Sequence, residues 1–324
     1  MFNLNLHSWQ ENDYNNLVKL KERLPNALVL QDSNKSSGIK NLASCWIKFL
    51  LCHNPINKTA CEKCSSCTFL YNDSHPDFYL LTAYDDEKKN KSINISDTRN
   101  AINFLSTASH ISKYKIILID DFTLLNINSS NALLKIIEEP PPHALFILLG
   151  SNINQLLPTI RSRCHIYTLS KPSFDIALDY VKKLNIQDDE FWLNYYDNNP
   201  LFEIEINQAQ LDSLISTLVE PNCNNIFSLT KEFNGKIVSF SFFVEFMLKW
   251  LSDMACAKMP NGKGKYFIKY DNIFDPLLSR LDLERLFYLN DRLIFLCSWF
   301  KHPLNYKLQI ENILLQYQQL FISR

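Results

Sequence analysis

The sequence is poor in glycine, in long apolar runs and in net charge. Only 5 of its 324 residues are glycine, so few positions can adopt a positive φ at low cost or let a phosphate approach the backbone closely. No stretch approaches the ~18 consecutive apolar residues of a membrane span, and the first residues lack the features of a signal peptide, so we expect a cytoplasmic protein. A formal net charge of -1 removes the global electrostatic drive for autonomous binding to nucleic acid.

Short β-type apolar runs alternate with helix-type stretches over residues 27–169. This alternation is typical of strand–helix–strand units, so it predicts an α/β domain with a parallel sheet and crossover helices. The strands are expected at Ala27–Leu30, Phe78–Leu81, Ile116–Ile119, Leu145–Leu149 and Ile166–Leu169, and the helices at Lys35–Cys52, Ser96–Ser109 and Ser129–Glu139.

Beyond Pro172 the β-type runs fade and helical periodicity takes over. We therefore expect three domains: an α/β domain at 1–168, a small helical domain at 169–209 and an all-helical domain at 210–324. The helices of the last two domains are expected at Phe174–Leu184, Asp188–Tyr196, Phe240–Cys256, Leu281–Phe300 and Tyr306–Phe321.

Four of the nine cysteines stand close together in the sequence. Cys52, Cys61, Cys64 and Cys67 form a Cys-x8-Cys-x2-Cys-x2-Cys pattern. Two-residue spacers bring thiolates around one ion in a tight turn, and four sulfur ligands complete a closed tetrahedral shell. This donor set predicts a structural zinc ion with no open position for water or substrate.

An iron–sulfur cluster and independent free thiols are the alternatives for this group. A ferredoxin-like run would have a fourth Cys followed by Pro shortly downstream, and none follows Cys67. His75 competes as a ligand, although a single His before Pro76 is more often structural. We expect the remaining cysteines to be buried apolar residues: Cys45, Cys164, Cys223, Cys256 and Cys297.

The loop after the first predicted strand is the place of a phosphate-binding loop in such a fold. It runs from Gln31 to Asn41 and contains one glycine where the motif has two, with no adjacent Gly-Lys-Ser/Thr. The charge of Asp32 would repel a triphosphate. We therefore predict no nucleotide in this loop, with a phosphate grip through Lys35 or Lys40 as the alternative.

The strand at Ile116–Ile119 resembles a Walker B strand because two aspartates follow it. Asp120 stands where an Asp holds magnesium, and Asp121 replaces the Glu that positions water and is one methylene shorter. We favour the simpler interpretation that both aspartates end a buried parallel strand and return the chain to water.

The stretch Asn131–Pro141, with its Glu-Glu-Pro-Pro end, looks like the matching helix of bacterial clamp-loader subunits, and Ser162-Arg163-Cys164 strengthens the resemblance. In that AAA+ family the arginine of Ser-Arg-Cys is an arginine finger. The resemblance therefore implies that Arg163 reaches the phosphates of ATP held by an adjacent motor subunit and stabilises transition-state charge. The alternative is that Arg163 only pairs with a surface carboxylate.

The resemblance also assigns a character to each expected domain. It implies a RecA-like AAA+ parallel sheet with an inserted four-cysteine zinc module at 1–168, a helical lid at 169–209 and a helical oligomerisation collar at 210–324. Leu201 follows Pro200 where family ATPases carry an Arg that senses the γ-phosphate.

Motor subunits of this DNA polymerase III family share the cysteines, the helix and the Ser-Arg-Cys, but they keep an intact phosphate-binding loop. Its loss here implies a subunit that does not hydrolyse ATP and is not itself an enzyme. The implied partners are the gamma/tau motor subunits and the delta subunit in a hetero-oligomer, with the sliding clamp and primer–template DNA in the complex.

Two other functions stay open from the sequence. The first alternative is an active ATPase of the same gamma/tau-like kind. The second is a zinc module that binds single-stranded nucleic acid through Lys58, Lys63 and the aromatic Phe69 or Tyr71. The basic, aromatic run Lys263–Tyr270 is typical of solvated loops or hairpins, and we assign it no function.

Overall fold

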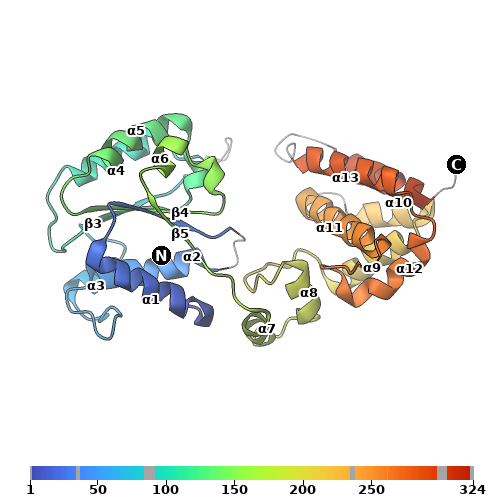
Figure 1. The fold of residues 1–324 in the computed structure, drawn as a ribbon, viewed down its shortest axis with the longest axis horizontal. Coiled ribbons are helices and arrows are strands. Elements are labelled where there is room, and N and C mark those ends of the chain that lie inside the picture. The colour runs from blue at the N-terminus through green and yellow to red at the C-terminus, as the bar shows by residue number, and fades with distance from the viewer. Residues whose placement is uncertain are drawn as a thin grey trace. The chain divides into compact units, whose positions relative to one another are not determined.

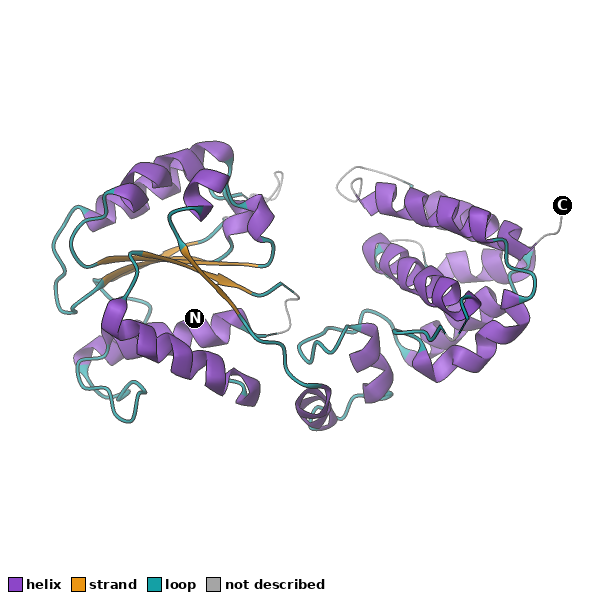
Figure 2. Cartoon of the chain, viewed as in Figure 1, coloured by secondary structure: helices purple, strands orange, loops and turns teal. Residues whose placement is uncertain are grey.

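The computed structural model describes residues 2–33, 37–83, 92–233, 238–260, 262–297 and 305–321. They form two compact units, Met1–Asp179 and Tyr180–Arg324. Among the described residues, all strands of the sheet lie in the first unit, whereas the second unit is helical (Figure 2). None of the described helices combines the length and the apolar character that crossing a membrane requires.

A sheet of five parallel strands in the order β2-β3-β4-β1-β5 forms the centre of the first unit. All five predicted strands are confirmed to within one residue at each end. Because all five strands are parallel, the loop that follows β1 starts at the carboxyl edge of the sheet, where open α/β sheets bind ligands. The strands are β1 (Ala27–Gln31), β2 (Phe78–Leu81), β3 (Lys115–Ile119), β4 (Ala144–Gly150) and β5 (His165–Thr168).

Both faces of the sheet are covered by helices (Figure 1). Successive side chains of a strand point to opposite faces, so Leu28 and Leu30 pack in one apolar core while Ala27 and Val29 pack in the other. The first core includes α1 (Glu11–Leu20), α2 (Ile39–Leu51) and α3 (Ser65–Tyr71), and the second includes α4 (Ile95–Leu105), α5 (Ile127–Glu138) and α6 (Pro158–Arg161).

Helix α4 ends four residues before the predicted Ser109, because a buried lysine fixes the chain beyond it. The ammonium group of Lys115 donates to the carbonyl oxygen of Thr107 at 2.9 Å and to its hydroxyl, and the side chain lies over the ring of Phe104. The carbonyl groups that follow the helix are therefore satisfied by a side chain instead of by a further helical turn.

The starts of α2 and α5 differ in their caps. Gly38 precedes α2 in the left-handed conformation, with φ of 68° and no side-chain cap, a conformation that glycine adopts at little cost. The side-chain oxygen of Asn126 accepts the backbone N–H of Ser129 at 2.8 Å and caps α5. That helix ends at Glu138, just before the three prolines.

One continuous apolar core holds the described part of the second unit together. Phe191 and Tyr195 of α8 belong to the same cluster as Trp250 of α11 and Tyr317 of α14. The division into a lid at 169–209 and a collar at 210–324 stays a prediction. The helices are α7 (Phe174–Lys182, which crosses the unit boundary), α8 (Asp189–Tyr195), α9 (Gln208–Val219), α10 (Cys223–Glu232), α11 (Phe240–Lys258), α12 (Asp271–Leu278), α13 (Leu283–Cys297) and α14 (Tyr306–Gln318).

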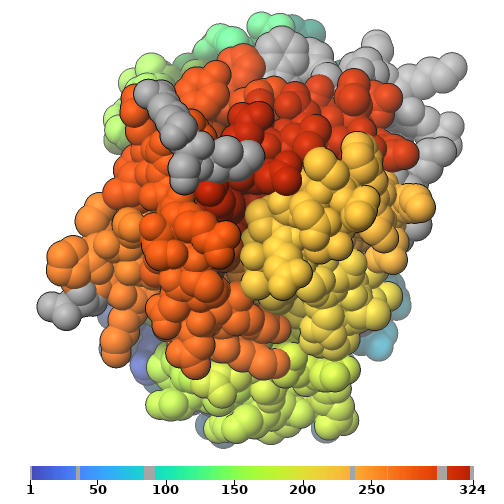
Figure 3. Space-filling view, turned by 90° about the vertical axis from the view of Figure 1, so that its right-hand side faces the viewer, coloured from blue at the N-terminus to red at the C-terminus, as the bar shows by residue number. Residues whose placement is uncertain are grey.

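The helices of the second unit pack in neighbouring pairs. Helix α9 lies beside α10, and α10 lies beside α14, while α11 contacts both α12 and α13. The last three residues of the helix predicted at Leu281–Phe300 lie outside the described residues. The space-filling view shows the α9–α10 segment, in yellow, lying directly against the orange and red segments that follow it in sequence (Figure 3).

A buried carboxylate fixes the loop between α11 and α12. Asp253 is fully buried and accepts the backbone N–H groups of Lys265, Tyr266 and Phe267 at 2.9, 2.8 and 2.7 Å. Gly264 passes close to this carboxylate, since a Cβ there would come within 2.9 Å of an oxygen of Asp253. Phe267 is fully buried in the core, so the interpretation of this run as a solvated loop is wrong for that residue.

Replacing Asp253 by Ala should lower the free energy of unfolding of the second unit by about 3 kcal/mol, because three backbone N–H groups lose a charged acceptor. Urea denaturation followed by circular dichroism measures the change. Asp275→Ala, at an exposed position of α12, is the matched control and should change stability by less than about 0.5 kcal/mol. Equal midpoints for the two variants would contradict the anchoring role of Asp253.

Candidate functional site

The four clustered cysteines come from the end of α2, the start of α3 and the loop between them. Cys52 follows the last residue of α2, Cys64 is the N-cap of α3 and Cys67 lies in the first turn of that helix. Cys61 belongs to the connecting loop. Helix termini fix three of the four positions, so the loop has only to bring Cys61 back to them.

A two-residue hairpin returns the loop. Ile56 and Thr59 exchange backbone hydrogen bonds of 2.9 and 2.8 Å. Between them Asn57 and Lys58 both have positive φ, the conformation of a type I′ turn. Glu62, between the second and third cysteines, also has positive φ, which turns the chain sharply toward the sulfur atoms.

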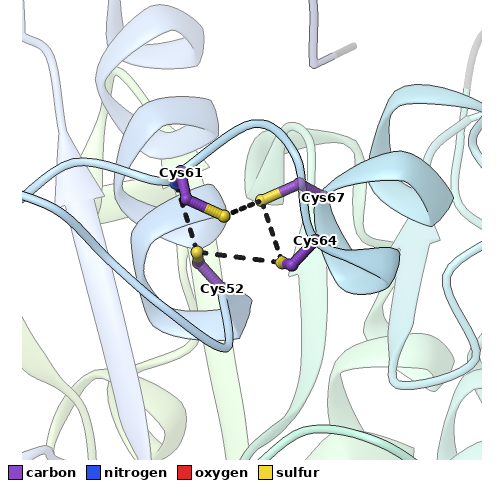
Figure 4. A group of neighbouring side chains, drawn as sticks. All are labelled: Cys52, Cys61, Cys64 and Cys67. Carbon is purple, nitrogen blue, oxygen red and sulfur yellow. Dashed lines mark hydrogen bonds between the residues drawn. The ribbon is translucent and has the colours of Figure 1, made fainter.

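The four sulfur atoms lie at distances that suit one metal ion. All ligand atoms are within 4.8 Å of one another, with Sγ–Sγ distances of 4.0 Å for Cys52–Cys64, 4.0 Å for Cys61–Cys67 and 3.5 Å for Cys64–Cys67 (Figure 4). Zinc–sulfur bonds of about 2.3 Å in a tetrahedron place neighbouring sulfurs about 3.8 Å apart. The group can therefore hold a metal ion in a closed four-sulfur shell.

Local hydrogen bonds already favour the thiolate at one corner of this group. Backbone N–H groups of Lys63 and Cys64 point at the sulfur of Cys61 and lower the pKa of that thiol to about 6. Burial acts in the opposite direction on Cys52 and Cys67 and raises the pKa of both thiols. A bound cation would favour the thiolate form of all four residues, since only the deprotonated sulfur is a ligand.

His75 supports this module and is not one of the grouped ligands. Burial lowers the pKa of its ring to about 4, so the ring is neutral. Nδ1 accepts the backbone N–H of Asp77 at 3.0 Å, which leaves Nε2 to donate to the hydroxyl of Ser66 at 2.9 Å. That hydroxyl donates to the carbonyl oxygen of Leu51 at 2.7 Å, so Ser66 joins α3 to the end of α2 and His75 holds the hydroxyl of Ser66.

The expectation for the five remaining cysteines is wrong for three of them, because Cys223, Cys256 and Cys297 are exposed. Cys45 and Cys164 are half-buried and pack against the two apolar cores of the first unit. The exposed three lie near the ends of helices α10, α11 and α13, where side chains leave the packed interior. Residue type alone does not say which face of a helix a cysteine occupies.

A carboxylate in the loop after β1 accepts a backbone N–H group of the same loop. Asp32 is only 4% exposed and accepts the backbone N–H and the hydroxyl of Ser37 at 2.9 and 3.2 Å. The carbonyl oxygen of Ser37 accepts the indole N–H of Trp9 at 3.2 Å. A negative charge thus lies next to an N–H group at the point where phosphate-binding loops direct N–H groups at their ligand.

Lys35 and Lys40 are the two candidate phosphate ligands of this loop. Lys35 lies outside the described residues. Lys40, in the first turn of α2, pairs with Asp120 at 2.8 Å, and both line a pocket of about 400 Å³ at the carboxyl edge of the sheet. The ammonium group of Lys40 is therefore paired with a carboxylate of the same chain.

The carboxylate of Asp121 also accepts hydrogen bonds from a nearby residue of the same chain. One of its oxygens accepts the backbone N–H of Thr123 at 2.9 Å and the hydroxyl of that residue at 2.7 Å, which caps the short turn Phe122–Leu124. These contacts agree with the interpretation that the two aspartates end a buried strand.

Leu201 belongs to the second unit, where its backbone N–H donates to the side chain of Asn199 at 2.9 Å.

Arg163 follows α6 and is half-exposed. Its Nη2 lies 2.7 Å from a carboxylate oxygen of Glu138, the last residue of α5, and its Nη1 donates to the carbonyl oxygen of Thr159 at 2.8 Å. The pairing with a surface carboxylate is thus present in the structure, and the role as an arginine finger stays a prediction. Burial raises the pKa of the neighbouring Cys164 to about 11, so that thiol is neutral.

Glu138 belongs to the Glu-Glu-Pro-Pro motif, but the sequence alone gives it no role. Glu138 and Arg163 are far apart in the chain and meet because α5 and α6 lie side by side on one face of the sheet (Figure 1). The two shared motifs that carried the resemblance are therefore in direct contact.

The aromatic residues of the cysteine module do not form one stacking platform. Phe69 and Tyr71 are 40% and 67% exposed, but they are two residues apart on α3. Residues with that spacing point to different sides of a helix. No observation on the described residues therefore favours stacked single-stranded nucleic acid at this module.

The strand order, the loop-to-helix junction after β1 and the helical second unit define a fold of the AAA+ kind. The fold resembles that of a solved gamma-subunit-related protein of DNA polymerase III from Thermotoga maritima, with 16% identity and a TM-score of 0.51 over 95% of this chain and 99% of that chain. Residues 9–173 match the family model described as DNA polymerase III, delta subunit, and the chain belongs to this family.

Two curated relatives place the chain more closely. It is 31% identical over 146 residues to the DNA polymerase III subunit delta' of Pseudomonas aeruginosa, covering 45% of this chain and 44% of that protein. It is 27% identical over 302 residues to the protein of the same name from Yersinia pestis, covering 86% and 83%. The match spans about half the length of the first curated relatives, 44% and 56%.

Replacing Cys61 by Ser should release the metal ion and lower the melting temperature of the first unit by about 5–10 °C, because metal binding contributes to folding. Metal content per chain and differential scanning calorimetry measure the two effects. Cys223→Ser, an exposed cysteine outside the group, should keep both the metal and the melting temperature. Equal metal content in the two variants would show that Cys61 is not a ligand.

Proposed function

We propose that this chain is a non-hydrolysing subunit, of the delta-prime type, of a DNA polymerase III clamp loader. It helps to load the sliding clamp onto primed DNA and supplies Arg163 to ATP held by an adjacent motor subunit. The observation that carries the proposal is the buried carboxylate of Asp32, which accepts the hydrogen bond of the Ser37 N–H in the loop after β1. Membership of the family and the delta' relatives support the clamp-loader context.

Electrostatics supports the absence of a nucleotide in the chain's own loop. A triphosphate would meet the negative charge of Asp32, and the nearby ammonium group of Lys40 is already paired with Asp120. Like charges at short range in a partly buried site are costly. Family ATPases instead direct several N–H groups and a free lysine at the phosphates.

The exposure of Arg163 supports its action on a neighbour. Its side chain is 39% exposed, so another subunit can reach the guanidinium group without any rearrangement of the backbone. An arginine that approaches the phosphates from a second protein stabilises the charge that develops in phosphoryl transfer. Catalysis would then be shared, with nucleotide binding on one subunit and part of the charge stabilisation on this one.

The proposal implies specific partners. These are the gamma/tau motor subunits and the delta subunit, in a hetero-oligomer that also contacts the sliding clamp and primer–template DNA in the cytoplasm. A net charge of -1 supports DNA contact within the complex and not by the isolated chain. The polymerase activity itself would belong to other subunits.

We propose zinc as the metal of the cysteine group. Four sulfur donors in a closed shell with Sγ–Sγ distances of 3.5 to 4.0 Å suit tetrahedral zinc. The zinc would join α2 to α3 and stabilise the first unit. Elemental analysis of the purified chain is expected to return one zinc per chain, and iron would contradict the assignment.

The isolated chain should not bind Mg-ATP at micromolar concentration. Isothermal titration calorimetry of the purified chain with ATP and magnesium measures this, with a motor subunit of the same loader as the positive control. Micromolar affinity would favour the alternative of an active, gamma-like ATPase.

Arg163→Ala should reduce ATP turnover by about a hundredfold or more at the adjacent motor site, since arginine fingers contribute large factors to phosphoryl transfer. The measurement needs a reconstituted loader in which only that motor subunit retains hydrolysis. Arg161→Ala is the matched control: this exposed arginine, two residues away, pairs with Asn154 and should leave turnover unchanged. Full turnover with Arg163→Ala would remove the trans-acting role from the proposal.

A further inference from the structure

The Glu138–Arg163 ion pair joins two ends of rigid secondary structure. Glu138 ends α5, and the backbone beyond it is fixed because the N–H of Glu139 bonds to the carbonyl oxygen of Lys135 at 3.1 Å. The backbone N–H of Arg163 bonds to the carbonyl oxygen of Ile160 at 3.0 Å, and Ile160 is fully buried against the sheet. Neither partner therefore sits on a loose loop.

The guanidinium group is held from two sides. Glu138 lies 2.7 Å from Nη2, and Nη1 donates to the carbonyl oxygen of Thr159 at 2.8 Å and to the hydroxyl of Ser162 at 3.3 Å. Contacts to both terminal nitrogens fix the plane of the group. Because a guanidinium group has five N–H donors, part of its fork is left for an outside acceptor.

We propose that Glu138 is a positioning residue that, together with the Thr159 carbonyl group, holds the Arg163 guanidinium group in the orientation that a phosphate of the neighbouring subunit requires. This inference rests on the proposed trans-acting role of Arg163. Without the carboxylate, the long side chain of an exposed arginine populates many rotamers, and only some of them direct the fork at the phosphate.

The pair positions the arginine without withholding it from a phosphate. The side chains are 39% and 46% exposed, and exposed ion pairs are weak because water screens them. A phosphate group carries more negative charge than one carboxylate and offers paired oxygens to the fork. An arriving phosphate therefore takes up the free N–H groups, while Glu138 and Thr159 keep the others in place.

The test uses the reconstituted loader with a single hydrolysing motor subunit next to this chain. Glu138→Ala should lower the turnover number by about three- to tenfold, with the KM for ATP nearly unchanged, because Arg163 acts mainly on the charge that develops in the transition state. Glu138→Gln keeps an acceptor oxygen at the same reach and should restore most of the turnover. Glu139→Ala, at the next and exposed carboxylate, is the matched control and should have no effect.

The variants are also combined with Arg163→Ala. If Glu138 acts only through this arginine, Glu138→Ala should cause no further loss in the Arg163→Ala background. Gel filtration and the melting temperature verify that each variant assembles and folds like the wild type.

The outcomes separate the two proposals. Unchanged turnover with Arg163→Ala overturns the trans-acting role itself. A loss with Arg163→Ala, combined with wild-type or faster turnover for Glu138→Ala, keeps that role and overturns the positioning of the arginine by Glu138. Equal losses for Glu138→Gln and Glu138→Ala also overturn the positioning role, since the acceptor oxygen would then be irrelevant.

Discussion

The buried carboxylate of Asp32 places a hydrogen-bond acceptor of the chain itself at the carboxyl edge of the sheet. It accepts the N–H and hydroxyl of Ser37, so one N–H group of the loop that would cradle phosphates already has an acceptor within the chain. Lys40 is likewise paired with Asp120. The scarcity of glycine agrees with our proposal of a loop that binds no phosphate, because such a loop does not need backbone that phosphates can approach closely. The fold thus keeps AAA+ architecture while, in our proposal, its chemistry lies elsewhere.

We propose that this chemistry takes place at the C-terminal end of α5, on the face of the sheet that α5 and α6 cover. Glu138 and Arg163 meet there because α5 and α6 are neighbours. The sheet supports both places. The loop after β1 starts at its carboxyl edge, and the helices on one of its faces carry the exposed guanidinium group. In our proposal the loop holds no nucleotide, and the guanidinium group acts on the nucleotide of a neighbour.

The cysteine module adds a second kind of support to the first unit. Its four sulfur atoms bring together the end of α2 and the start of α3. The hydroxyl of Ser66, held by the neutral ring of His75, bonds the same two helices through the carbonyl oxygen of Leu51. Hydrogen bonds, and metal ligation in our proposal, thus hold the same two helices. The second unit relies instead on one aromatic-rich core and on buried acceptors such as Asp253.

The sequence alone determined the five strands, the grouping of four cysteines and the clamp-loader resemblance. These are encoded locally: apolar runs of strand length, Cys-x2-Cys spacing and short motifs are read within a few residues. Only the tertiary structure decided which cysteines are exposed and that Glu138 contacts Arg163. It also decided that Phe267 is buried, with its backbone N–H bonded to Asp253. Each of these depends on residues distant in the chain, because packing and pairing are set by which elements become neighbours and not by spacing along the sequence.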